Sequence, residues 1–139
     1  MMNQVSVVFL QIQKNTQKIE KIIDTVTYHF EKKEPFQFIV SDENSKNFLD
    51  DLLWQNPITG FLPHKTSNLP CKDMIVITLE KEILNQAKTV FNLTKEPLAL
   101  DQSFRIIYEF DDQSKPEKSE ISKKKYHFYK ERKYYIESR

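Results

Sequence analysis

The chain has 139 residues, enough for one domain with its own core, and its ten Phe and six Tyr exclude wholesale disorder. The single cysteine, Cys71, excludes an internal disulfide, and the lack of any apolar run near ~18 residues excludes a membrane span, so we expect a cytoplasmic protein. Residues 1–112 carry 12 basic against 16 acidic side chains and residues 113–139 carry nine against four, which suits the C-terminal segment to an anionic partner.

The first 40 residues predict a strand, a helix and a second strand. Residues 4–10 (QVSVVFL) are β-branched and mostly apolar, as in a strand covered on both faces. Pro35 disfavours helical geometry before it, and residues 36–40 (FQFIV) predict the next strand. Between them, Asn15 or Thr16 can cap a helix whose apolar residues recur at steps of three and four, namely Ile19, Ile22, Ile23, Val26 and Phe30.

The middle of the chain predicts a second helix and then three short strands. Ser41 or Asp42 can cap this helix, which must end by Pro57. The β-branched runs that follow predict strands at residues 74–79, 89–93 and 105–110. The stretches 80–87 and 94–101 show no clear period and are expected to be loops.

The order of these elements predicts an α/β fold. We expect one three-layer domain over residues 1–139, with a mostly parallel sheet of about five strands and flanking helices, Rossmann-like in outline. Gly60 is the only glycine, whereas a P-loop or a dinucleotide fingerprint needs glycine where backbone amides approach phosphate closely. The sequence therefore predicts no nucleotide site of these kinds and no cofactor.

Candidate catalytic residues are few. His29 lies beside Phe30 on the first helix, where a histidine is usually structural. His64 has no histidine or cysteine at a metal-ligand spacing, and Ser41 is explained more simply as a helix cap than as a nucleophile. We therefore predict neither a catalytic nor a metal site, and a small enzyme is the least favoured class of function.

The basic C-terminal segment predicts a helix at about residues 115–136. On a helical wheel Ile121, Phe128 and Tyr135 fall close to one line, the spacing of a face that packs on a sheet. A cationic, aromatic opposite face suits phosphates and bases, or a peptide with carboxylates and an aromatic side chain. A solvated, Lys-rich helix is the alternative. The opposite face consists of Lys123, Tyr126, Lys130 and Lys133, with His127 and Tyr134 beside it.

An unusually apolar stretch surrounds an expected turn. Residues 49–64 (LDDLLWQNPITGFLPH) hold the only tryptophan of the chain. Trp54, Phe61 and Leu62 flank Asn-Pro and Thr-Gly pairs, which are typical of turns. These side chains either close the core of the protein or dock a partner.

Three stretches resemble the chi subunit of bacterial DNA polymerase III. Residues 49–54 (LDDLLW), followed by 61–64 (FLPH), are similar to a helix end and a turn that recur in this family. Residues 36–43 (FQFIVSDE) look like its second strand and the helix start that follows. Residues 123–130 (KKKYHFYK) resemble the basic and tyrosine pattern of its last helix. The stretches occur in the family's order and, with the strands between them, cover most of the chain.

The resemblance implies a non-catalytic accessory subunit of the clamp-loader assembly with two protein partners. One is a psi subunit, whose contacts in the family match Trp54 and Phe61. The other is the acidic, phenylalanine-ending tail of the single-stranded-DNA-binding protein. The family's tail-binding residues match Lys123 and Tyr126. His127 stands where the family usually has a second basic residue, and Lys130 lies beside it in the motif. The resemblance also implies that the strand end at Phe110 lies near this site.

Two further classes of function stay open beside this adaptor. In the adaptor reading, nucleic acid is reached only indirectly and no membrane is involved. The alternative is a direct single-stranded nucleic-acid-binding protein that uses the basic, aromatic face of residues 123–134, and it predicts tight, strongly salt-dependent binding of bare oligonucleotides. A small α/β enzyme instead predicts a ligand-filled cleft at the carboxyl ends of the strands.

Overall fold

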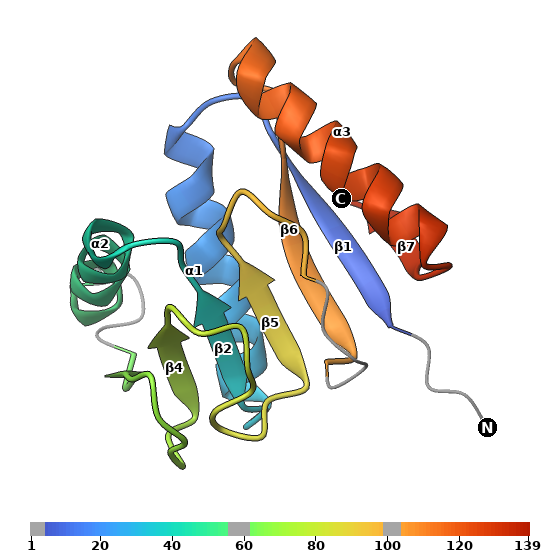
Figure 1. Cartoon of the computed structure of the whole chain (residues 1–139). Coiled ribbons are helices and arrows are strands. Elements are labelled where there is room, and N and C mark those ends of the chain that lie inside the picture. Colours follow the sequence, from blue (N-terminus) through green and yellow to red (C-terminus); the bar gives the residue numbers. More distant parts are fainter. Residues whose placement is uncertain (1–4, 56–61, 99–103) are drawn as a thin grey trace.

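The computed structural model describes residues 5–55, 62–98 and 104–139, which form one open sheet with helices on both faces (Figure 1). All pairings between the described strands are parallel, in the order β3-β4-β2-β5-β6-β1-β7. The strands are β1 (Ser6–Ile12), β2 (Phe36–Ile39), β3 (Lys65–Thr66), β4 (Ile75–Thr78), β5 (Thr89–Asn92), β6 (Ile106–Asp112) and β7 (Tyr135–Ser138). The helices are α1 (Thr16–Glu31), α2 (Glu43–Trp54) and α3 (Pro116–Glu131).

The helices form two layers with the sheet between them. Helices α1 and α2 cover one face, where Val26 and Leu53 belong to the same core cluster as Phe38 of the sheet. Helix α3 lies across the other face over β6 and β1, where Tyr129 packs edge-on against Phe9 (Figure 1). The predicted three-layer α/β architecture is confirmed.

The first two helices begin where the sequence predicts. Asn15 precedes α1, although its side chain makes no capping hydrogen bond. Asp42 caps α2, and its carboxylate accepts a hydrogen bond of 2.7 Å from the backbone N–H of Ser45. This hydrogen bond lowers the pKa of Asp42, since it favours the ionised carboxylate. The strand-helix-strand beginning predicted from periodicity is therefore present.

The sheet is larger than predicted, with seven strands in the described residues instead of about five. Both additional strands lie at its edges: β3 pairs with β4, and β7 pairs with β1. Strand β3 has only two residues, which is too short for a recognisable period. Strand β7 (Tyr135–Ser138) begins within the last two residues of the segment predicted as helix.

The C-terminal helix is shorter than the predicted 115–136 and packs through a different face. It ends at Glu131, and Lys133 takes a left-handed φ of 63°, which turns the chain back toward the sheet. Tyr135 is therefore a strand residue and cannot share a helix face with Ile121 and Phe128. The residues that α3 buries are Ser122, Lys125 and Tyr129.

Candidate protein interaction surfaces

Trp54 is the last residue of α2 and lies at the surface. On this helix Leu49 and Leu53, four residues apart, are buried on one face. Trp54 follows Leu53 and therefore points away from that face. The Trp54 side chain is 51% exposed. Its ring meets the His64 ring edge-on, with 5.2 Å between centroids. Trp54 therefore lies at the surface with its ring packed against the His64 ring.

His64 braces this corner of the molecule. One ring nitrogen, Nδ1, lies 2.6 Å from the Leu62 carbonyl, and Nε2 lies 2.6 Å from the Asp50 carboxylate on α2. The backbone N–H of Leu62 donates to the Leu53 carbonyl at 2.8 Å. We call Asp50, Trp54, Leu62 and His64 the Trp54 corner. The other aromatic predicted here, Phe61, lies outside the described residues.

A second exposed aromatic lies along one edge of α3. Tyr126 is 39% exposed and packs on Phe9 of β1, with 6.1 Å between ring centroids. The ammonium of Lys130 lies 5.8 Å from the centroid of the tyrosine ring, and Lys123 is exposed one turn earlier on the helix. His127 is exposed beside Tyr126. Lys123, Tyr126, His127 and Lys130 form what we call the α3 edge, which offers cations around an aromatic ring.

The last residue predicted for this surface, Phe110, lies elsewhere. Side chains of β6 alternate between the two faces of the sheet, and Phe110 packs on the face covered by α1 and α2. Its ring contacts Phe91, with 5.1 Å between centroids, and lies 5.9 Å from the Lys18 ammonium. Tyr126 lies on the opposite face with α3. The structure therefore brings together four of the five predicted tail-binding residues and separates Phe110 from them.

Comparison with protein families identifies the group to which this chain belongs. Residues 2–137 match the family described as DNA polymerase III chi subunit, HolC. The chain is a member of the chi subunit family. A comparison with curated proteins gives no match. As a chi-family protein, it is an accessory subunit of DNA polymerase III.

The catalytic and metal-site candidates raised by the sequence gain no support in this chi-family protein, within the part of the chain that the structure describes. His29 is buried, with Nε2 at 2.9 Å from the Tyr108 hydroxyl and Nδ1 at 2.8 Å from Glu34. Within residues 5–55, 62–98 and 104–139, no group of three or more His, Cys, Asp or Glu could hold a metal ion. The same part of the chain has no helix with the length and apolarity that a membrane crossing requires.

Sequence reasoning missed a buried polar network that holds α3 of this chi-family protein to the sheet. Glu109, in the middle of β6, is fully buried, and the Lys125 ammonium lies 2.8 Å from its Oε1. Its other oxygen, Oε2, accepts hydrogen bonds from Asn92 at 2.7 Å and from the Tyr129 hydroxyl. Lys125 also donates to the Thr94 carbonyl.

This network explains why the predicted packing face was wrong. A lysine and a tyrosine can turn inward because a carboxylate on the sheet pairs with them, so the buried stripe of α3 is not apolar. Burial raises the pKa of Glu109, against the opposing effect of Lys125, and burial also raises that of Tyr129. One sequence signal was available: a glutamate inside the β-branched, aromatic run of residues 106–110 (IIYEF).

A second polar contact joins α1 to the end of β6. Lys18 reaches the Asp112 carboxylate at 2.6 Å, and the backbone N–H of Ser114 donates to it at 3.0 Å. Burial alone would raise the pKa of Asp112, but the hydrogen bonds from Lys18 and Ser114 hold it below its usual value.

The lowered pKa of Asp112 predicts a loss of stability in acid. The ionised carboxylate contributes stability above the unfolded pKa of ~3.9, and this contribution is lost as the pH falls through the lower folded value. We expect Asp112→Asn to reduce the free energy of unfolding by about 1–2 kcal/mol at pH 7, with a smaller difference at pH 3, measured by urea denaturation. Asp24→Asn, at an exposed position on α1, is the control. An equal deficit at both pH values would contradict this assignment.

Proposed function

We propose that this chi-family protein is a non-catalytic cytoplasmic adaptor that links the clamp loader to single-stranded-DNA-binding protein. In this proposal the Trp54 corner, together with Phe61, docks a psi-like subunit. The α3 edge binds the acidic C-terminal tail of the single-stranded-DNA-binding protein. The observation that carries the proposal is the separate exposure of Trp54 and Tyr126, one on α2 and one on α3, on opposite faces of the sheet.

The chemistry of the α3 edge suits an acidic peptide that ends in phenylalanine. Lys123 and Lys130 can pair with carboxylates, including the terminal one, while the exposed Tyr126 ring offers a flat surface to the phenyl side chain. Phe9 supports the tyrosine from below, so its ring is held in place before the peptide arrives. Because these charges are exposed, the affinity should be modest and should decrease with salt.

We expect Tyr126→Ala to weaken binding of an acidic, phenylalanine-ending peptide by about tenfold, because the aromatic contact is lost while the lysines stay. Fluorescence anisotropy with a labelled peptide measures this. The matched control is Tyr28→Ala. Tyr28 on α1 is 52% exposed, and the ammonium of Lys32 lies over its ring, 4.5 Å from the ring centroid. Equal losses in both variants, or no saturable binding to the wild-type protein, would overturn the tail-binding assignment.

Direct binding of single-stranded nucleic acid is the second candidate, because cations around an aromatic ring also suit phosphates and bases. The two functions separate in the same experiment. An oligonucleotide that binds more tightly than the peptide, with a steep salt slope and the same Tyr126 dependence, would favour nucleic acid. The adaptor predicts that a labelled oligonucleotide binds only weakly at low salt.

A further inference from the structure

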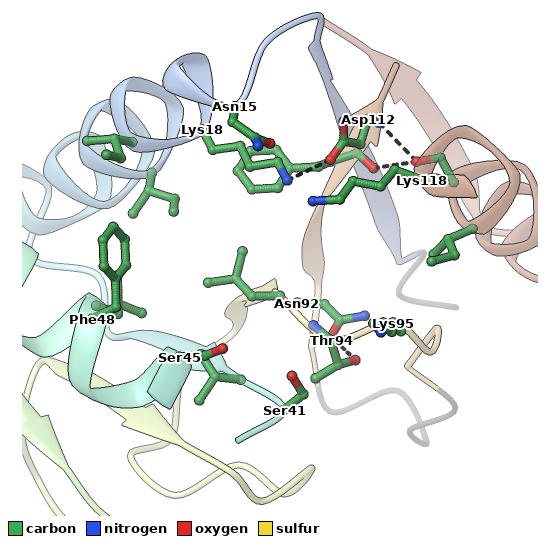
Figure 2. Close-up of a pocket in the computed structure, with 18 of the residues that line it drawn as sticks. Asn15, Lys18, Ser41, Ser45, Phe48, Asn92, Thr94, Lys95, Asp112 and Lys118 are labelled. Atoms are coloured by element: carbon green, nitrogen blue, oxygen red, sulfur yellow. Dashed lines mark hydrogen bonds and ion pairs between the residues drawn. The ribbon is translucent and has the colours of Figure 1, made fainter. Parts of the chain in front are cut away.

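A cleft of about 630 Å³ opens at the carboxyl ends of β2, β5 and β6. The N-terminal parts of α1 and α2 and residues of α3 between Lys118 and Lys125 surround it (Figure 2). Parallel α/β sheets bind ligands at this end of their strands, and the volume lies in the range of small-molecule sites. Neither Trp54 nor any residue of the α3 edge lines this cleft, so it is distinct from both surfaces of the proposed adaptor.

One wall of the cleft concentrates positive charge. Lys18 from α1 and Lys118 from α3 extend toward each other beside Asp112 (Figure 2). The nearby Lys18 ammonium lowers the pKa of Lys118, as expected when two cations are held close together. An anion between the two ammonium groups would remove this repulsion.

The charges that face the cleft leave a positive excess. Its lining contains four lysines and one aspartate. Buried Glu109 pairs with Lys125, and Asp112 pairs with Lys18. The excess positive charge therefore comes from Lys118 and Lys95. The charge of Lys95 is partly offset by Asp42, because Lys95 helps to lower the pKa of the Asp42 carboxyl group. Lys115 adds further positive potential at Lys118. A phosphate monoester, with a charge of about −1.5 to −2 at pH 7, matches this excess better than a single carboxylate.

The other wall is apolar and open to solvent. Phe48 of α2 is 57% exposed, and Ile19 of α1 is 40% exposed. Both line the cleft, as does the partly buried Phe110. Figure 2 shows Phe48 on the α2 side, across the opening from Lys118. Exposed apolar side chains gathered in one cleft opposite a group of cations are the pattern of a site for an amphipathic anion.

We propose that this cleft binds a small organic phosphate, with its phosphoryl group between Lys18 and Lys118 and its apolar body against Phe48. Side-chain ammonium groups, not a glycine-rich loop, hold the phosphate, which is consistent with a chain that has a single glycine. The site is a binding site without chemistry on the ligand, and it does not depend on the adaptor function.

Phenyl phosphate is the probe for this site, titrated into isotope-labelled protein at low salt and followed by amide NMR shifts. We expect saturable shifts at residues around the cleft with a millimolar dissociation constant. Lys118→Ala should weaken binding about tenfold, and Asp112→Asn should strengthen it, because the competing carboxylate is removed. Lys124→Ala, at an exposed position of α3 outside the cleft, should have no effect. Phe48→Ala should weaken phenyl phosphate but not inorganic phosphate.

Several results would overturn the site. These are the absence of saturable shifts at the cleft, binding that Lys118→Ala leaves unchanged in a variant with wild-type thermal stability, or benzoate binding as tightly as phenyl phosphate. Displacement of phenyl phosphate by the acidic tail peptide would instead make the cleft part of a peptide site. Tyr126→Ala keeps the two proposals apart, because it should weaken the tail peptide and leave phenyl phosphate unaffected.

Discussion

Replacing Lys125 with methionine is expected to lower the free energy of unfolding by about 3–5 kcal/mol, because it leaves the Glu109 carboxylate buried without its cation. Methionine keeps much of the length and volume of the lysine stem, so the loss reports mainly on charge. Urea denaturation at pH 7 measures it. Lys124→Met is the matched control, since Lys124 is the exposed neighbour on the same helix and should change stability by less than ~0.5 kcal/mol.

Two further measurements test the assignment of this loss to Glu109. The double variant Lys125→Met/Glu109→Gln should recover more than half of it, because glutamine still accepts hydrogen bonds from Asn92 or Tyr129 but carries no charge. The deficit of Lys125→Met should also shrink as the pH falls. Burial raises the pKa of Glu109 in the native state and Lys125 opposes this rise, so removing Lys125 raises that pKa further. Protonation of Glu109 in acid therefore stabilises the variant more than the wild-type protein. A deficit that neither change reduces would show that lost packing, not the unpaired charge, causes it.

Replacing Trp54 with alanine is expected to weaken binding of a psi-like subunit by about 30-fold or more, which corresponds to ~2 kcal/mol for a central aromatic anchor. The isolated protein should lose little stability, because half of this side chain is already exposed. Isothermal titration calorimetry with the purified partner measures the binding, and urea denaturation measures the stability. Leu53→Ala gives the contrast, since Leu53 is fully buried and its truncation should cost about 2–5 kcal/mol of stability.

Phe48→Ala is the control that makes the Trp54 result specific. Phe48 is an aromatic residue of similar exposure on the same helix, but it lines the cleft at the strand ends. Loss of psi-like binding in Phe48→Ala, with Trp54→Ala unaffected, would move the docking surface to the cleft. His64→Ala should give an intermediate loss of binding, because the ring that supports Trp54 and ties Leu62 to Asp50 is removed.

Local sequence patterns were reliable where one short segment carries the whole signal. The steps of three and four in α1, the Asp42 cap of α2 and the β-branched runs at β4, β5 and β6 each depend on residues close together in the chain. The strand and helix start at residues 36–43 and the tryptophan-containing turn at residues 49–64 also lie within short stretches, so the family resemblance could be recognised before any fold was known. The family match over residues 2–137 confirms it.

The C-terminal segment shows where this reasoning failed. A helical wheel treats lysine as a surface residue, yet Lys125 is buried while Ile121 is only partly so. That inversion depends on Glu109, 16 residues away in the chain, which accepts from Lys125 inside the protein. Strand β7 was missed for a related reason, since it pairs with β1, which is more than 120 residues away in the sequence.

The amino-acid sequence alone was enough for the α/β class, the order of most elements, the family and the two aromatic groups on which the proposed adaptor depends. Only the folded chain determined which side chains share a surface: Phe110 lies on the opposite face of the sheet from Tyr126, while Lys18 and Lys118, 100 residues apart, meet at one cleft. The physical reason is that periodicity records which side of an element is apolar. Periodicity does not show which distant charge will pair with a buried one. Nor does it show which elements the crossover connections of the sheet bring together.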